Sequence, residues 1–185
     1  FGKTGHFRKS GLAVPQNIFL EDLQRLFNLL QFYKPEQLIV VGDLFHSKSN
    51  KEHLLFKKWR NDFTQLEILL VKGNHDVLRN EWYEQIKINV FDDEALRINS
   101  FAFMHDHAHI EKFPEHEDAY FFTGHLHPGI SIHGRSRQSL SFPCFYFNEH
   151  FAVLPAFSNF SGLALINKTK TDNVFAIVND ELIEM

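Results

Sequence analysis

Two short apolar runs in the first half of the chain most constrain its fold. They are QLIVV at 37–41 and LEILLV at 66–71, and each has the length of a buried strand. A segment with helical spacing precedes the first run, with apolar residues predicted to share one helix face: Phe19, Leu23, Leu26, Phe27 and Leu30. Pro35 is expected to end this helix. The chain therefore alternates helix and strand from its start.

The rest of the chain extends this pattern and then changes it. Residues 50–63 are predicted to form a helix with Leu55, Trp59 and Phe63 on its buried side. From residue 96 onward the apolar runs are those of strands separated by turns. Alternating elements followed by strands predict an α/β or α+β fold, with helices outside packed sheets. No repeat or linker interrupts the sequence, so we expect one domain over residues 1–185.

Composition limits the classes of function. Of the 185 residues 44% are hydrophobic and 23% charged, which is typical of a globular protein, and 12 are histidine. The net charge of −4 argues against binding nucleic acid by charge alone, so a phosphate ligand needs a local attraction such as a metal ion. One cysteine, Cys144, fits a reducing cytoplasm. No run has the length of a membrane span, and we expect a cytoplasmic protein without membrane contact.

Four clusters of polar side chains follow apolar runs. Asp43 follows the first run, the motif GNHD at 73–76 follows the second, and His105 and the motif GHLH at 124–127 follow later ones. Ligands gather beyond the carboxyl ends of strands, so these clusters are expected to converge. A mixed set of nitrogen and oxygen donors suits Mn, Fe, Zn or Ni. A carboxylate such as Asp43 can bridge two cations, and two cations about 3.5–4 Å apart can hold a phosphate ester.

In this order, GD-x-x-H at 42–46, GNHD at 73–76, His105 and GH-x-H at 124–127 resemble the calcineurin-like metallophosphoesterases. The resemblance implies a four-layer αββα sandwich of two mixed sheets flanked by helices. It also implies two divalent metal ions, with Mn²⁺ favoured and Fe, Zn or Ni open. By resemblance, Asp43 bridges the two ions, His127 binds the first, and three residues complete the second site: Asn74, His105 and His125.

The resemblance also assigns acid–base roles within GNHD. His75 is expected near the leaving-group oxygen, where it can protonate it, and Asp76 is expected to orient the imidazole through its far ring nitrogen. His46 is expected to brace its loop rather than to bind metal. His105 is preferred as the ligand over His107 and His109, because it comes first after its strand.

Several polar residues are expected to have no part in the site. Four histidines are predicted at the surface: His53, His116, His133 and His150. Lys57, Lys58 and Arg60 are predicted to form the solvated face of the second helix.

Three further stretches resemble the bacterial ligase-associated metallophosphoesterases, namely residues 2–15, 124–128 and 154–162. Those proteins are grouped with an ATP-dependent DNA ligase, a helicase and an exonuclease in DNA repair. The resemblance makes Lys3, His6 and Arg8 candidates for substrate contact, with a solvated loop as the equal alternative. The family carries Asp-x-His at the end of its first strand. We expect that strand, with both metal ligands, to precede Phe1.

The leading hypothesis is a dimetal phosphodiesterase or nuclease in which metal-bound hydroxide attacks the phosphate ester. Its expected substrate is single-stranded DNA, a DNA end or a small nucleotide, with the repair proteins named above as candidate partners. A phosphoesterase of small molecules, such as nucleotides or sugar nucleotides, is the alternative enzyme. An inactive scaffold of the same fold is the alternative outside enzymes, as in the retromer subunit that keeps this fold. Homodimerisation, frequent in such families, is left open.

Overall fold

The computed structural model describes residues 17–46, 51–134, 138–159 and 161–185. The chain divides into two compact units. The described part of unit 1 lies within residues 17–94 and 158–159, and unit 2 comprises 95–157 and 161–185. No helix in the described ranges has the length and apolar character that crossing a membrane requires.

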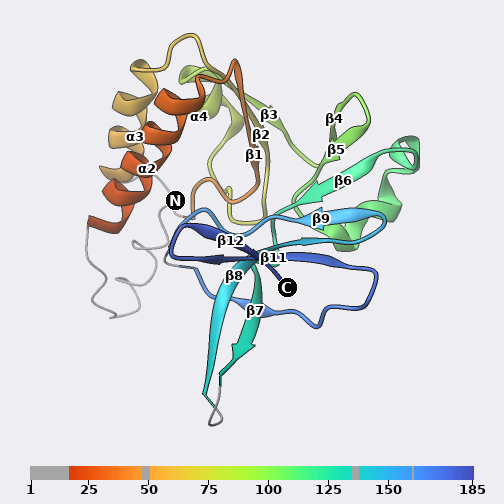
Figure 1. The fold of residues 1–185 in the computed structure, drawn as a ribbon. Helices are drawn as coiled ribbons and strands as arrows, with labels where there is room; N and C mark the ends of the chain where they lie inside the picture. Colours follow the sequence, from red (N-terminus) through yellow and green to blue (C-terminus); the bar gives the residue numbers. More distant parts are fainter. Residues whose placement is uncertain (1–16, 47–50, 135–137, 160) are drawn as a thin grey trace. The chain divides into compact units, whose positions relative to one another are not determined.

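Unit 1 consists of alternating helices and parallel strands. Its elements are α2 (Asn17–Tyr33), β1 (Gln37–Val41), α3 (Lys51–Asn61), β2 (Glu67–Val71), α4 (Asn80–Gln85) and β3 (Ile88–Phe91). The strands form a parallel sheet in the order β1-β2-β3, since a helix connects each strand to the next. Helices α2 and α3 lie side by side next to this sheet (Figure 1). The carboxyl ends of β1 and β2 therefore meet at one edge.

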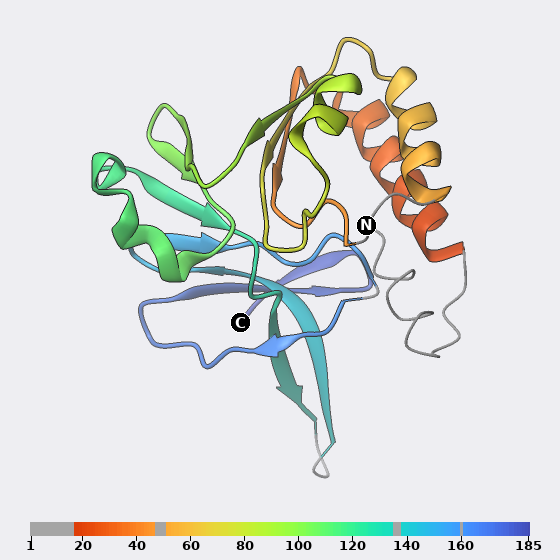
Figure 2. The same ribbon diagram turned by 180° about the vertical axis from the view of Figure 1, so that it is seen from behind.

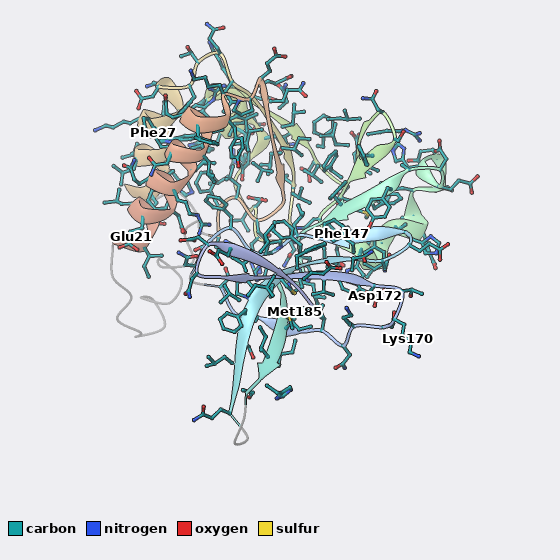
Figure 3. The ribbon with its side chains drawn as sticks, viewed as in Figure 1. Glu21, Phe27, Phe147, Lys170, Asp172 and Met185 are labelled. Atoms are coloured by element: carbon teal, nitrogen blue, oxygen red, sulfur yellow. The ribbon has the colours of Figure 1, made fainter. Side chains whose placement is uncertain are left out.

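The predicted apolar face of α2 forms much of the core of unit 1. Phe19, Leu23 and Leu26 are buried together with Leu30. Phe27, labelled in Figure 3, is half-buried, and its ring centroid lies 5.4 Å from that of Phe63. After Tyr33 the chain turns at Lys34, which has a φ of 46° and donates its N–H to the carbonyl of Leu30. The helix thus ends before Pro35, as predicted.

Helix α3 buries only part of the predicted face, because Trp59 is buried but Leu55 is not. Phe56 and Trp59 are buried, whereas Leu55 is 38% exposed. His53 and Arg60 were expected in solvent but are also buried. The apolar spacing of this helix allows Phe56 to be buried beside Trp59 in place of Leu55, and the ring of Phe56 buries more apolar surface than Leu55 would.

Arg60 is buried because its guanidinium fits a cluster of backbone carbonyls. It donates to the carbonyl oxygens of Ile86 at 3.1 Å and Leu66 at 2.9 Å, and also to that of Phe63. These carbonyls belong to the segments that follow α3 and α4 and precede β2. A planar group with five N–H donors can satisfy several acceptors at once, which offsets the cost of burying the charge.

Unit 2 is built mainly from strands. They are β4 (Leu96–Ile98), β5 (Phe101–Phe103), β6 (Tyr120–Thr123), β7 (Pro128–His133), β8 (Ser139–Phe147), β9 (Phe151–Val153), β10 (Ala164–Leu165), β11 (Asn173–Val178) and β12 (Glu181–Glu184). The short 3-10 helices η1 (His107–Lys112) and η2 (Pro114–His116) lie between β5 and β6. Their sheet has the order β10-β7-β8-β9-β6-β5-β4, and β11 pairs with β8 and β12 (Figure 2).

The sheet of unit 2 places two chemically important strand ends side by side. Strands β5 and β6 are parallel neighbours, with Phe103 opposite Phe122. His105 and His125 each come two residues after the end of these strands. Half-buried aromatic rings also cluster on strands of this unit, as at Phe147 (Figure 3), whose ring lies 6.4 Å from that of Phe145 and 6.0 Å from that of Phe175.

The predicted α/β class, with two sheets and helices, is confirmed. In detail, the smaller sheet is parallel throughout its described strands, and two short strands were not singled out by the prediction: β3 and β7. They have only four and six residues, too few for a clear alternating pattern. The four-layer stacking and the single domain remain predictions.

Candidate metal centre

The loop after β1 presents Asp43 through an unusual backbone turn. Gly42 has a φ of 80° and Asp43 a φ of 55°, so two successive residues lie in the left-handed region. Glycine enters this region without steric cost, and aspartate is among the few other residues that tolerate it. Leu44 and Phe45 follow and are buried. The turn thus raises Asp43 at the end of β1 while the next two side chains enter the core.

Phe45 anchors this loop in an aromatic cluster. Its ring centroid lies 4.6 Å from that of His53, 5.0 Å from that of Phe56 and 5.4 Å from that of Trp82, each pair nearly edge to face. Edge-to-face pairs are the favoured arrangement of aromatic rings. Phe45 is 1% exposed, so the chain between Asp43 and His46 is held firmly at its middle.

Asp43 connects the loop after β1 with the GNHD turn after β2. Its Oδ1 accepts a hydrogen bond of 3.0 Å from the backbone N–H of His75, and its Oδ2 lies 3.7 Å from Nε2 of His46. The rings of His46 and His75 are stacked, with centroids 4.7 Å apart. Donor atoms of Asp43, His46 and His75 all lie within 4.8 Å of one another. This arrangement brings His46, expected only to brace the loop, into a group that could hold a cation.

The carboxylate of Asp76 is buried beneath this group and has other partners than the expected one. Its Oδ1 accepts from the N–H of Phe45 at 3.0 Å and from the hydroxyl of Tyr83 at 3.2 Å, and its Oδ2 accepts from the N–H of Gly73 at 2.9 Å. The predicted hydrogen bond to the ring of His75 is therefore replaced by bonds that fix both loops. Asp76 thus ties the loop after β1 to the GNHD turn, because a buried carboxylate binds the nearest N–H groups.

Burial dominates the acid–base behaviour of Asp76. Desolvation raises the pKa of its carboxyl group above the usual range, and the charge of Asp43 acts in the same direction. The N–H donors of Gly73, Phe45 and Leu44 oppose this shift without cancelling it. Desolvation and the neighbouring carboxylate of Asp76 also raise the pKa of Tyr83 strongly, so its phenol stays protonated and donates. Nothing in the sequence pattern points to Tyr83.

In unit 2 the imidazoles of His105 and His125 face each other. Nε2 of His105 lies 2.9 Å from Nδ1 of His125, and the rings are nearly perpendicular. The carbonyl of His105 also accepts from the N–H groups of Gly124 and His125, so two backbone hydrogen bonds hold the two loops together. The ring nitrogens thus converge on one point at the carboxyl ends of β5 and β6.

This spacing suits a shared cation. Two imidazole nitrogens that bind one ion at about 2.1 Å and at a right angle lie about 3 Å apart. The observed 2.9 Å between His105 and His125 also suits a hydrogen bond between the rings, with one ring as donor. The donor set therefore fits a divalent transition metal in place of that proton.

The remaining predicted ligands lie in the same turns. Asn74 is exposed in the GNHD turn, beside His75. His127 has a φ of 51°, and its carbonyl accepts from the N–H of Ala164, which ties the GHLH loop to β10.

The other histidines of unit 2 are distributed around this pair. His107 stacks on Phe151 with ring centroids 5.0 Å apart, and His109 is exposed on η1. Partial burial alone would raise the pKa of Asp106, but the N–H of Ala108 and the nearby imidazoles of His125, His107 and His109 outweigh it and lower that pKa. His133 and His150 are exposed, as predicted. Lys3, His6 and Arg8 lie outside the described residues.

Comparison with known proteins agrees with this chemistry. The model of the family "Calcineurin-like phosphoesterase" matches residues 16–177. A solved structure, the nuclease MPE of Pseudomonas putida, aligns with a TM-score of 0.76 at 27% sequence identity, covering 95% of this chain and 82% of that one.

Two Vps29 structures from Entamoeba histolytica align more weakly. The wild type complexed with zinc has a TM-score of 0.32 and 12% identity, covering 80% of this chain and 96% of that one. The D62A mutant has a TM-score of 0.34 and 15% identity, covering 80% and 98%. A comparison with curated proteins gave no match.

Proposed function

Because this chain belongs to the calcineurin-like phosphoesterase family, whose members hydrolyse phosphate esters with divalent metal ions, we propose that it is a metal-dependent phosphodiesterase that cuts DNA. The observation that carries the proposal is the similarity to the Pseudomonas putida nuclease over 95% of this chain. The polar strand ends of each unit support it, because they present nitrogen and oxygen donors of the kind that such ions bind.

The proposed ligands come from both units. Asp43 and Asn74 would bind metal in unit 1, and His105, His125 and His127 in unit 2. His46 joins the proposed set, because its Nε2 lies 3.7 Å from Oδ2 of Asp43. When bound, divalent ions would polarise the phosphate ester and lower the pKa of water enough to supply hydroxide near neutral pH.

His75 would transfer the proton in this proposal. Its ring is exposed and stacked on His46, and its backbone is fixed by Asp43. An accessible imidazole held in one orientation is a suitable general acid for the departing oxygen. Asp76 would serve by holding the two loops in register rather than by touching the imidazole.

The acidic charge of the chain narrows the proposed substrate. A net charge of −4 disfavours tight binding of a long duplex, whose affinity depends on neutralising many phosphates. Single-stranded DNA or a DNA end, with fewer phosphates to hold, is the substrate we propose, in a repair setting with Mn²⁺ as the working ion. A small nucleotide ester is the second candidate, favoured by the same charge.

A substrate panel tests this proposal. The protein would be incubated with Mn²⁺, Fe²⁺, Zn²⁺ or Ni²⁺ and with single-stranded DNA, duplex DNA and bis-p-nitrophenyl phosphate. We expect cleavage of the single strand and of the chromogenic diester with at least one ion. An Asp43→Asn variant should lose both, and His133→Ala, at an exposed position, should keep both. Hydrolysis of the chromogenic ester without any DNA cleavage would favour the small-nucleotide candidate.

A further inference from the structure

Unit 2 contains a pocket next to the loops that carry its proposed metal ligands. Its volume is about 230 Å³. The lining residues that matter here are His107, Leu126, Tyr146, Phe151, Ile166 and Asn167. His107 follows His105 by two residues, and Leu126 stands between His125 and His127. Two of the pocket walls are therefore continuous with the chain segments that would hold a metal ion.

One wall of the pocket is an aromatic stack. The rings of His107 and Phe151 are nearly parallel, with centroids 5.0 Å apart and an interplanar angle of 29°. The ring of Tyr146 lies 6.3 Å from that of Phe151. His107, Tyr146 and Phe151 are only half-buried, so part of each side chain is open to solvent where it lines the pocket. A flat, partly open aromatic wall is the kind of surface on which another flat ring stacks.

The chemistry of the lining argues against a phosphate as the occupant. The described lining contains no Lys, Arg, Asp or Glu, so it offers no charge to balance a phosphate. It does offer the exposed carboxamide of Asn167, which can both donate and accept hydrogen bonds. The fitting ligand is flat, uncharged and mostly apolar on its faces, with a polar edge, and a nucleobase has all of these properties.

We propose that this pocket binds a nucleobase of the substrate against the aromatic wall that His107, Tyr146 and Phe151 form. The inference rests on the proposed function, because the base would belong to the nucleotide whose phosphate is hydrolysed. A sugar alone separates base and phosphate, so a base site is expected near the loops that hold the metal. The pocket then selects nucleotide esters over sugar phosphates and simple diesters.

Kinetics on two esters with the same leaving group tests this. Thymidine 5′-(p-nitrophenyl phosphate) carries a base, and methyl p-nitrophenyl phosphate does not. Base–aromatic stacking contributes enough binding energy to raise kcat/KM by about 5- to 150-fold for the thymidine ester. His107→Ala should abolish most of that preference without slowing the methyl ester. His107→Phe should keep it, and Phe32→Ala, at a ring 78% exposed on α2, should change nothing.

A binding experiment makes the inference independent of catalysis. The whole protein, freed of metal by chelation, would be titrated with AMP and, separately, with ribose 5-phosphate while NMR follows the ring protons of His107. We expect AMP to shift these signals and ribose 5-phosphate to leave them in place. The base site would be contradicted if His107→Ala kept the same preference for the thymidine ester as the wild type. It would also be contradicted if AMP shifted none of the His107 signals. Failure to hydrolyse either ester, with the AMP shift intact, would count against the proposed function alone.

Discussion

His75 combines two properties at the scale of a single residue: its backbone is fixed and its ring is accessible. The bond from its N–H to Asp43 and the stack on His46 restrict the ring without burying it. A general acid needs both properties, because it must reach the leaving group in one orientation and exchange protons with solvent afterwards.

We therefore predict that His75→Asn slows hydrolysis in proportion to the need for a proton. With an alkyl leaving group, kcat should fall by about 10²–10⁴-fold, the usual contribution of general acid catalysis. With p-nitrophenolate, which leaves without a proton, the loss should be much smaller. Steady-state rates of both esters at saturating Mn²⁺ check this, and His133→Ala serves as the control. Equal losses on both leaving groups would contradict the acid role.

Among structural elements, the segment from Gly42 to His46 depends on Phe45. We predict that Phe45→Ala lowers the free energy of unfolding by about 3–5 kcal/mol, because it leaves a cavity among the rings of His53, Phe56 and Trp82. It should also weaken metal binding, since the loop that carries Asp43 loses its anchor. Urea unfolding followed by tryptophan fluorescence measures the free energy of unfolding, because Trp59 and Trp82 both lie in unit 1. If Phe45→Ala lost as little free energy of unfolding as the control Leu55→Ala, at an exposed position, the anchoring role of Phe45 would be contradicted.

Helix α3 carries a pH-dependent contribution at His53. Burial lowers the pKa of this imidazole below 6.5, although the charge of Glu52 opposes the shift. The folded state therefore binds a proton less readily than the unfolded state. The stability that the neutral imidazole of His53 gives to the folded state is fully present above pH 6.5. It is lost as the pH falls from 6.5 toward the lowered pKa of His53 in the folded state.

We predict that wild-type stability falls relative to His53→Gln across that window, by up to about 1.4 kcal/mol for each pH unit. Chemical denaturation of both proteins between pH 7.5 and 5 measures the difference, which removes the contributions of the other histidines. Parallel pH curves for the two proteins would show that His53 titrates normally in the folded chain.

The elements also show what the sequence can and cannot predict. The strands at 37–41 and 66–71 were predicted almost to the residue, because a short apolar run between helical segments has few other solutions. The burial of His53 and Arg60 could not be predicted, since it depends on rings and carbonyls that approach from distant segments. The same holds for Asp76, whose partner Tyr83 is set by packing of α4 rather than by any motif.

At the scale of the whole molecule, metal binding should stabilise the fold. A ligand that binds only the folded state at 100 times its dissociation constant adds about 2.7 kcal/mol. We predict that Mn²⁺ at that level raises the unfolding midpoint of wild type and that chelation with EDTA reverses it. Asp43→Asn should show a much smaller shift at the same Mn²⁺ concentration. Calorimetry with and without EDTA measures the shift of the unfolding midpoint. An equal shift in wild type and Asp43→Asn would show that the ion binds at a site without Asp43.

The most direct test joins metal content and hydrolysis in the same samples. Wild type, Asp43→Asn, His125→Ala and the control His133→Ala would be loaded with Mn²⁺, freed of excess ion, and assayed for bound metal and for hydrolysis of bis-p-nitrophenyl phosphate. We predict that Asp43→Asn and His125→Ala lose bound metal and nearly all activity while His133→Ala retains both. Full metal content and full activity in Asp43→Asn or His125→Ala would contradict the assignment of the strand-end residues as the catalytic metal ligands.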